Sequence, residues 1–168
     1  MALPPELKES LRRRHKFVDW QGAGETTGGP PLRGLEFKGD ELPGWEPVKA
    51  RRNEALQPPR LDTFWRPKGD TEGTLLGVHV IECASVPAAR EALLEALADF
   101  QSAAIDRRTD LGVGEVVFGQ EFMLVFARGN LVVFVRNAGR HVVPVLESAR
   151  ILDAHISRLL RGERREPR

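Results

Sequence analysis

The most apolar part of the chain, residues 114–137, reads as three consecutive strands. Segments rich in Val, Phe and Leu occupy 115–118, 122–127 and 131–136, and short glycine-containing turns separate them. The second turn is Gly129-Asn130, a pair typical of two-residue hairpins because both residues accept a positive φ. The pattern therefore predicts an antiparallel meander whose register is set by that turn.

The hairpin built on this turn is apolar on both of its faces. Phe126 is predicted to face Val133, and Ala127 to face Val132, because side chains alternate between the two faces of a strand. A sheet with one solvent face would alternate apolar and polar residues instead, so both faces need a cover. The first face carries Phe122, Leu124, Phe126, Leu131, Val133 and Val135, and the second carries Met123, Val125, Ala127, Val132 and Phe134.

Two segments have the spacing of amphipathic helices. Residues 86–102 follow Ser85, a good N-cap, and carry apolar residues at steps of three and four. Residues 144–160 repeat that spacing, and Gly162 then ends the helix. We expect both helices to cover the first face of the hairpin.

Three candidates remain for the cover of the second face. They are the tryptophan-bearing N-terminal half, a second copy of the chain, and an apolar ligand or partner. We expect them in that order, since an apolar face of several hundred Å² is unusual on a monomer.

Shorter strand-like segments lie near 46–52, 61–66 and 73–83. Together with the meander and the two helices they predict an α+β fold. Its sheet is mostly antiparallel with about five strands, and two helices pack on one face.

The N-terminal region has a different composition. A short helix is predicted over 5–17, and residues 21–40 are rich in Gly, Pro and Thr without periodicity. The glycines of this stretch lack the Gly-Lys-Ser/Thr ending of a phosphate loop. The predicted organisation is an irregular arm over 1–40, a single α+β domain over 41–162, and a charged tail over 163–168.

The three tryptophans, at positions 20, 45 and 65, all lie in the N-terminal half. Clustered aromatic residues in a loop-rich region either line a binding surface or fasten irregular segments onto a core. In the first case they would act together with the second face of the hairpin. The candidate binding residues are therefore Trp45, Trp65, Met123, Val125 and Phe134.

Sequence spacing provides no catalytic or metal-binding motif, and no cofactor is predicted. His79 and Cys83 lie on one strand, about 13 Å apart along it, which is too far for a nucleophile–base pair. Cys83 is the single cysteine, and it fits a small buried hydrophobe better than a nucleophile. Asp153 and His155 point to different sides of a helix and cannot bind one metal together.

Charge and hydropathy argue against two further classes of partner. The net charge is +1, and no basic stripe with interleaved aromatic residues occurs, so nucleic-acid binding is not predicted. No run of 18 apolar residues is present, so a membrane-spanning helix is not expected. The chain as given is expected to be cytoplasmic, the alternative being an exported mature domain without its signal peptide.

The layout from Leu42 onward resembles a group of known domains. It contains LPGW at 42–45, a strand and a helix, FARGNLVVFV at 126–135, and a terminal helix with ARILDAHI at 149–156. This order is similar to small α+β domains of uncharacterised bacterial exported or lipoprotein-type proteins. The resemblance implies an envelope location and carries no catalytic residues.

These observations favour a non-catalytic protein-interaction module that self-associates. The alternative is a small-molecule-binding domain with an apolar pocket between the sheet and the tryptophan-bearing N-terminal segments. An enzyme is the less favoured class, because no convergent polar groups follow from the spacing.

Overall fold

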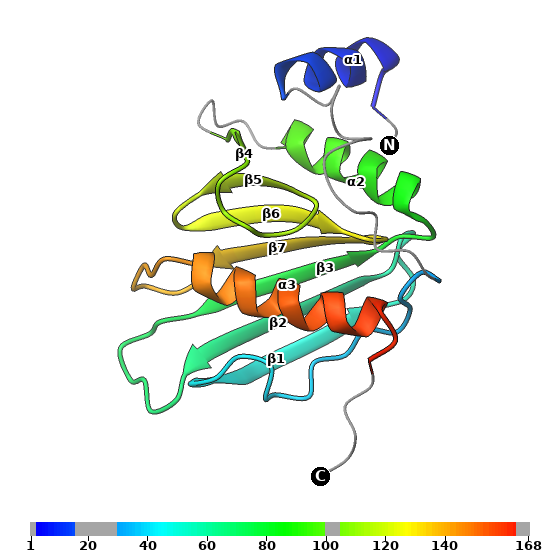
Figure 1. Cartoon of the computed structure of the whole chain (residues 1–168). Coiled ribbons are helices and arrows are strands. Elements are labelled where there is room, and N and C mark those ends of the chain that lie inside the picture. The colour runs from blue at the N-terminus through cyan, green and yellow to red at the C-terminus, as the bar shows by residue number, and fades with distance from the viewer. Residues whose placement is uncertain (1–2, 16–29, 100–104, 164–168) are drawn as a thin grey trace.

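The computed structural model describes residues 3–15, 30–99 and 105–163. One antiparallel sheet of seven strands runs through this part of the chain, in the order β1-β2-β3-β7-β6-β5-β4 (Figure 1). The strands are β1 (Trp45–Asn53), β2 (Arg60–Pro67), β3 (Leu76–Glu82), β4 (Arg107–Arg108), β5 (Val116–Gln120), β6 (Met123–Arg128) and β7 (Leu131–Asn137).

The expectation of about five strands is wrong. The two-residue strand β4 forms in a polar connection because Arg107 and Arg108 pair with Phe118 and Val117 of β5. The strand expected near 46–52 forms as the nine-residue β1, and eight of its residues pair with β2. Pairing with a neighbouring strand, and not the local apolar pattern, sets the extent of both edge strands.

The predicted register of the hairpin is confirmed. Ala127 pairs with Val132 and Phe126 with Val133 across the turn, as side-chain alternation requires. Gly129 has a φ of 56°, and this positive φ is what a two-residue hairpin turn demands.

The three helices are α1 (Pro5–Arg14), α2 (Val86–Asp99) and α3 (Leu146–Leu160). They do not share one face of the sheet, so the expectation that both long helices pack on one face is wrong. Figure 1 shows α3 lying across the front of the sheet, and α2 packs on the opposite face with the second side of the β6–β7 hairpin. The physical reason is the two-sided apolar pattern, because two helices on one face would leave the other face bare to water.

Each face has its own apolar core. The first is built from β2, β3, β7, β6 and β5 against α3 and the segments before β1 and β5. Its members are Leu35, Leu42, Leu61, Trp65, Leu76, Val78, Val80, Leu111, Val113, Val117, Leu124, Phe126, Leu131, Val133, Val135, Val145, Ala149, Leu152, Ile156 and Leu160. The second is built from β5, β6 and β7 against α2 and α1, with the members Leu11, Cys83, Ala89, Leu93, Leu94, Leu97, Ile105, Val116, Phe118, Val125, Ala127 and Val132.

The segment before β1 is fastened to the first face by buried polar side chains. Asn130 of the hairpin turn donates from Nδ2 to the carbonyl oxygen of Leu32 at 2.9 Å and accepts the Leu32 N–H at 2.8 Å. Glu82 accepts the N–H of Gly34 at 2.8 Å and pairs with Arg52 at 2.9 Å. The N-terminal half was the first expectation for the cover of the second face, but this segment covers the first face together with α3.

From the N-terminal part, α1 adds to the second face. Leu11 joins the core beneath α2, and Lys8 and Arg12 pair with Glu91 of α2 at 2.7 and 2.8 Å.

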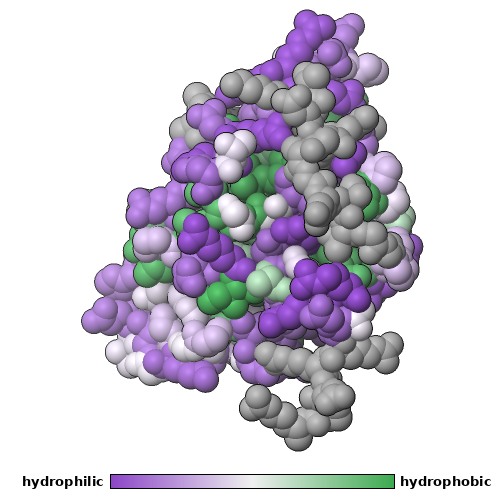
Figure 2. Space-filling model, in the orientation of Figure 1, coloured by the Kyte–Doolittle hydropathy of each residue, from purple (hydrophilic) through white to green (hydrophobic). Residues whose placement is uncertain are grey.

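None of the helices in residues 3–15, 30–99 and 105–163 has both the length and the apolar composition needed to cross a bilayer. Figure 2 shows hydrophilic residues over most of the α3 face, with apolar residues in smaller areas between them.

Candidate functional site: a cleft between α2 and the sheet

A cleft of about 540 Å³ opens on the second face, where α2 stops covering the sheet. The sheet wall comes from β2, β3, β7 and β6, the helix wall from α2, and one end from the β1–β2 loop. The lining residues are Leu56, Gln57, Pro58, Arg60, His79, Ile81, Ala92, Glu95, Ala96, Asp99, Met123, Phe134 and Arg136.

The cleft is hollow because of the small residues on the side of α2 that faces it. Ala92 and Ala96 lie one turn apart on this side. The neighbouring positions Leu93 and Leu97 are buried in the second core instead. A longer side chain at Ala92 or Ala96 would therefore project into the cleft.

A hydrogen-bonded network lies at the foot of the cleft. Register places Asp62 of β2 opposite His79 of β3, and His79 Nδ1 lies 2.6 Å from Asp62 Oδ1. Arg60 Nε donates to the same oxygen at 2.7 Å. On the other side of the ring, Arg136 Nε donates to His79 Nε2 at 3.2 Å.

These contacts assign a neutral His79 with its proton on Nδ1. Nδ1–H donates to a carboxylate, while Nε2 accepts from a guanidinium that has no lone pair to offer. Burial lowers the pKa of His79, the Asp62 carboxylate raises it in part, and the Arg136 charge lowers it again, so the net shift is downward. Burial alone would raise the pKa of Asp62, but the hydrogen bonds from Arg60 and His79 outweigh it and the pKa falls.

Glycine at position 77 makes room for the network. A Cβ on Gly77 would lie 3.1 Å from His79 Nε2 and 3.5 Å from Arg136. Phe64, which pairs with Gly77 across the strands, contacts the imidazole edge-on, with ring centroids 5.5 Å apart. The His79 ring is therefore held by Asp62, Arg136 and Phe64, and it is only 4% exposed.

The candidate binding residues from the sequence are divided between the two faces. Met123 and Phe134 line the cleft, whereas Val125 is fully buried beneath α2. Trp65 is also fully buried, but in the first core, and Trp45 is partly buried against that core. The structure therefore brings Met123 and Phe134 together and separates them from both tryptophans.

Sequence reasoning missed the polar network of the site: Arg60, Asp62 and Arg136 were not singled out, and His79 was considered only together with Cys83. Arg60 and Asp62 alternate with the buried Leu61 and Thr63, and this alternation was a signal that they share a face. The alternation alone does not show which strand lies beside β2, and so which side chains meet Arg60 and Asp62. The pairing of β2 with β3 and of β3 with β7 decides this.

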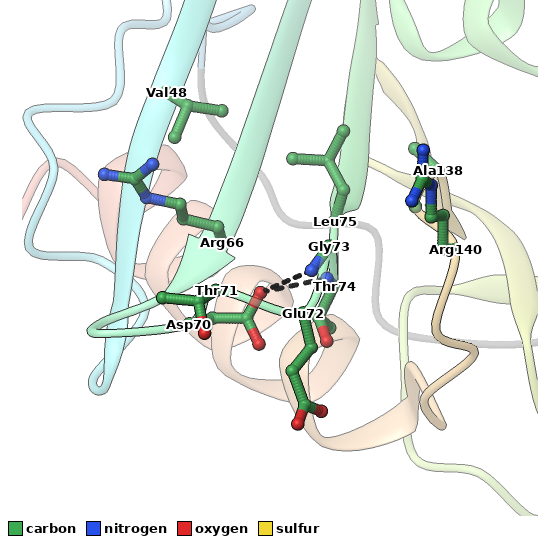
Figure 3. A pocket seen from close by; sticks show the side chains of 11 residues that line it. Val48, Arg66, Asp70, Thr71, Glu72, Gly73, Thr74, Leu75, Ala138 and Arg140 are labelled. Carbon is green, nitrogen blue, oxygen red and sulfur yellow. Dashed lines mark hydrogen bonds between the residues drawn. The ribbon is translucent and has the colours of Figure 1, made fainter.

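A larger and more open depression of about 780 Å³ lies beside the β2–β3 turn (Figure 3). Its central carboxylate, Asp70, accepts the N–H groups of Gly73 and Thr74 at 3.1 and 3.0 Å. The same hydrogen bonds lower the pKa of Asp70, that from Thr74 most. Because this carboxylate is used to hold the turn, the depression is a weaker candidate than the cleft.

Within residues 3–15, 30–99 and 105–163, no group of three or more His, Cys, Asp and Glu side chains could hold a metal ion. No family model, curated protein or solved structure was found to match this chain. The site is therefore interpreted from its own geometry.

Proposed function

We propose that this protein is a non-catalytic binding module whose cleft between α2 and the sheet takes a peptide-like ligand. The ligand has a compact apolar group and charges of both signs. One observation carries the proposal: the cleft sets two guanidinium groups on one wall against two carboxylates on the other, across an apolar floor. The guanidiniums belong to Arg60 and Arg136 and the carboxylates to Glu95 and Asp99.

The apolar floor supports a ligand with a small hydrophobic side chain. Ile81, Met123 and Phe134 are partly buried and lie between the charged walls. A volume of about 540 Å³ is in the range of sites for small organic ligands. Methionine and aromatic side chains adapt to several apolar shapes, which suits a short peptide segment of a partner protein.

Opposed charges make a doubly charged ligand preferable to an anion or a cation. An anion would be attracted by Arg60 and Arg136 but repelled by Glu95 and Asp99. A cation would be attracted by the two carboxylates but repelled by the two guanidinium groups. A ligand with both charges satisfies both walls, and complementary charge favours specificity over raw affinity.

A binding role fits the state of His79 better than catalysis does. A general base needs a free nitrogen within reach of its substrate, but Nδ1 of His79 is bonded to Asp62 and Nε2 to Arg136. Cys83 is 1% exposed, and burial raises the pKa of its thiol to about 11. Neither residue is in the state of an activated catalytic group.

The test uses methyl-labelled methionine. The chain has two methionines, Met1 and Met123, so ¹³C-methyl labelling gives one signal from the cleft, and Met123→Leu assigns it. Three probes are titrated: the dipeptide Ala-Leu, its N-acetylated form and its C-terminal amide. The Met123 methyl signal is expected to shift saturably, and each capped form should bind about tenfold more weakly, equivalent to about 1.4 kcal/mol.

Two alanine-to-leucine variants provide the control. Ala96→Leu fills the cleft and should abolish the shift, whereas Ala154→Leu, at an exposed position of α3, should leave it unchanged. The indole N–H signals of Trp45 and Trp65 should not move, because they lie on the opposite face. No Met123 shift with any probe up to about 10 mM, where a millimolar ligand would fill most sites, would contradict the proposal. Equal affinity of the three probes would contradict charge recognition.

A further inference from the structure

Strand β1 is an edge strand that is open on several sides. It ends the sheet, and its inner edge is paired with β2 at every residue except Val48. Residues 47–51 are five consecutive exposed positions. The Trp45 N–H at its start bonds to the Leu42 carbonyl oxygen, but in the described part of the chain no backbone hydrogen bond is made to the outer edge of residues 48–53. Its free N–H and C=O groups are a ready template for another strand.

The charges beside this edge are unequal. On the second face of β1 and β2, four cations lie with two carboxylates: Lys49, Arg51, Arg60 and Arg66 with Glu46 and Asp62. Both carboxylates already have partners, because Glu46 pairs with Arg66 at 2.6 Å and Asp62 with Arg60 at 2.7 Å. This leaves a cationic surface at Lys49 and Arg51, which are both exposed.

From this edge and its charge we infer a second interaction site, which takes an extended acidic segment of a partner protein as an eighth strand beside β1. Lys49 and Arg51 are two residues apart and project from one face. An added strand with carboxylates at alternate positions would set them at the same interval of about 7 Å, on the same face. Main-chain hydrogen bonds would supply affinity and the alternate carboxylates specificity, as in other strand additions.

The β1 strand also limits where the added strand can pair. Pro47 has no N–H to donate, and the β1–β2 register shifts between Pro47 and Lys49. The added strand is therefore expected to pair from Lys49 to Asn53. On the other face of this stretch Ala50 is exposed and small, so a Val or Thr beside it meets no obstacle.

A second copy of this chain fits the edge less well. Pairing two β1 edges would bring Lys49 and Arg51 close to the same cations of the other copy, and like charges on neighbouring strands are destabilising. Cations on an edge are a known protection against self-pairing. The same charges that oppose a copy of the chain attract an acidic segment.

The experiment uses the peptide acetyl-TVEVEVT-amide, its glutamine counterpart TVQVQVT and its lysine counterpart TVKVKVT. The glutamate peptide is expected to shift the backbone amide signals of residues 49–53 and to bind at least about tenfold more tightly than the glutamine peptide at low salt. Raising the ionic strength to about 1 M, where the Debye length is near 3 Å, should remove most of that difference.

Two further arms separate strand addition from simple charge attraction. N-methylation of one set of alternate peptide residues should abolish binding, and N-methylation of the other set should leave it intact, because an added strand uses one edge. Lys49→Glu with Arg51→Glu should reverse the preference from the glutamate to the lysine peptide, whereas Lys68→Glu, in the exposed β2–β3 turn, should not.

Each outcome decides the inference. Equal binding of the two N-methylated peptides, or no binding of the glutamate peptide at millimolar concentration, would overturn it. Sedimentation showing a dimer that Lys49→Glu strengthens would assign the edge to a second copy instead. The Met123 methyl signal should stay unchanged throughout, so failure of this inference and failure of the proposed cleft function are distinguishable.

Discussion

Replacing Asp62 tests whether the network at the foot of the cleft stabilises the fold. In Asp62→Asn the remaining amide oxygen still accepts from His79 and Arg60, but the negative charge is lost. A hydrogen bond to a charged group is worth about 1 kcal/mol more than a neutral one. The bond to His79 is buried and should lose about that amount, while the bond to Arg60, whose side chain is 41% exposed, should lose only a few tenths.

The free energy of unfolding is therefore expected to fall by about 1–1.5 kcal/mol in Asp62→Asn. Asp62→Ala should lower it by about 2–3 kcal/mol, because the buried Nδ1–H of His79 then has no acceptor. Urea unfolding followed by tryptophan fluorescence measures both, since Trp65 is fully buried. For Asn, the midpoint should fall by about 0.5 M.

The same variant changes the pH dependence, and the sign follows from His79. The pKa of His79 in the folded state lies below the ordinary 6.5. As the pH falls below about 6.5, His79 therefore takes up a proton in the unfolded chain before it does so in the folded protein. The free energy of unfolding falls over this range, because the unfolded state binds more protons. Asp62 raises the pKa of His79, so Asp62→Asn should make the loss from about pH 7 to 5 larger. The pKa of His15 is also lowered by burial, but its contribution is common to both proteins and cancels.

The matched control is Asp110→Asn, which removes a carboxylate from an exposed pair with Arg108. It should leave the urea midpoint unchanged. If Asp62→Asn is as stable as the wild type and has the same pH profile, the His79–Asp62 contact has no energetic weight and the reasoning fails.

Three other predictions follow from single contacts. Thr63→Val removes the buried acceptor of the Trp65 Nε1–H, which lies 3.1 Å away, and should lower the free energy of unfolding by about 1–3 kcal/mol in urea; an unchanged midpoint would contradict this. Gly119→Ala would place a Cβ 2.2 Å from a carbonyl oxygen at a φ of 130° and should cost about 3 kcal/mol or more. Gly112→Ala, with a φ of 65° and open space, should cost only about 1 kcal/mol, and equal losses would refute the steric argument. Cys83, with a pKa near 11 and 1% exposure, should react with iodoacetamide only after unfolding, as mass spectrometry can follow; rapid alkylation of the folded protein would show that the thiol is accessible.

The local elements were predictable because short-range rules decide them. The hairpin turn at Gly129 and Asn130 needs only its two residues, and alternation then sets which side chains share a face. The helical stripe of α2 likewise follows from spacing alone. What spacing could not decide was the face on which each helix packs, because both faces of the hairpin are apolar.

The candidate site was predictable only in part. Met123 and Phe134 were expected on an apolar face that needs a cover, and they line the cleft that α2 leaves open. The network of Asp62, His79 and Arg136 joins residues 17 and 57 positions apart in the chain. No local pattern announces such a contact, because it depends on which strands become neighbours.

By itself the sequence determined the helices, the register of the β6–β7 hairpin and the need for two covered faces. These properties depend on side-chain periodicity and on turn conformations a few residues long. The tertiary structure alone decided that α3 covers one face and α2 the other, that β3 lies between β2 and β7, and that a charged cleft remains beside α2. Those outcomes depend on long-range pairing, in which many apolar segments compete for the same surfaces and the arrangement that buries both faces together prevails.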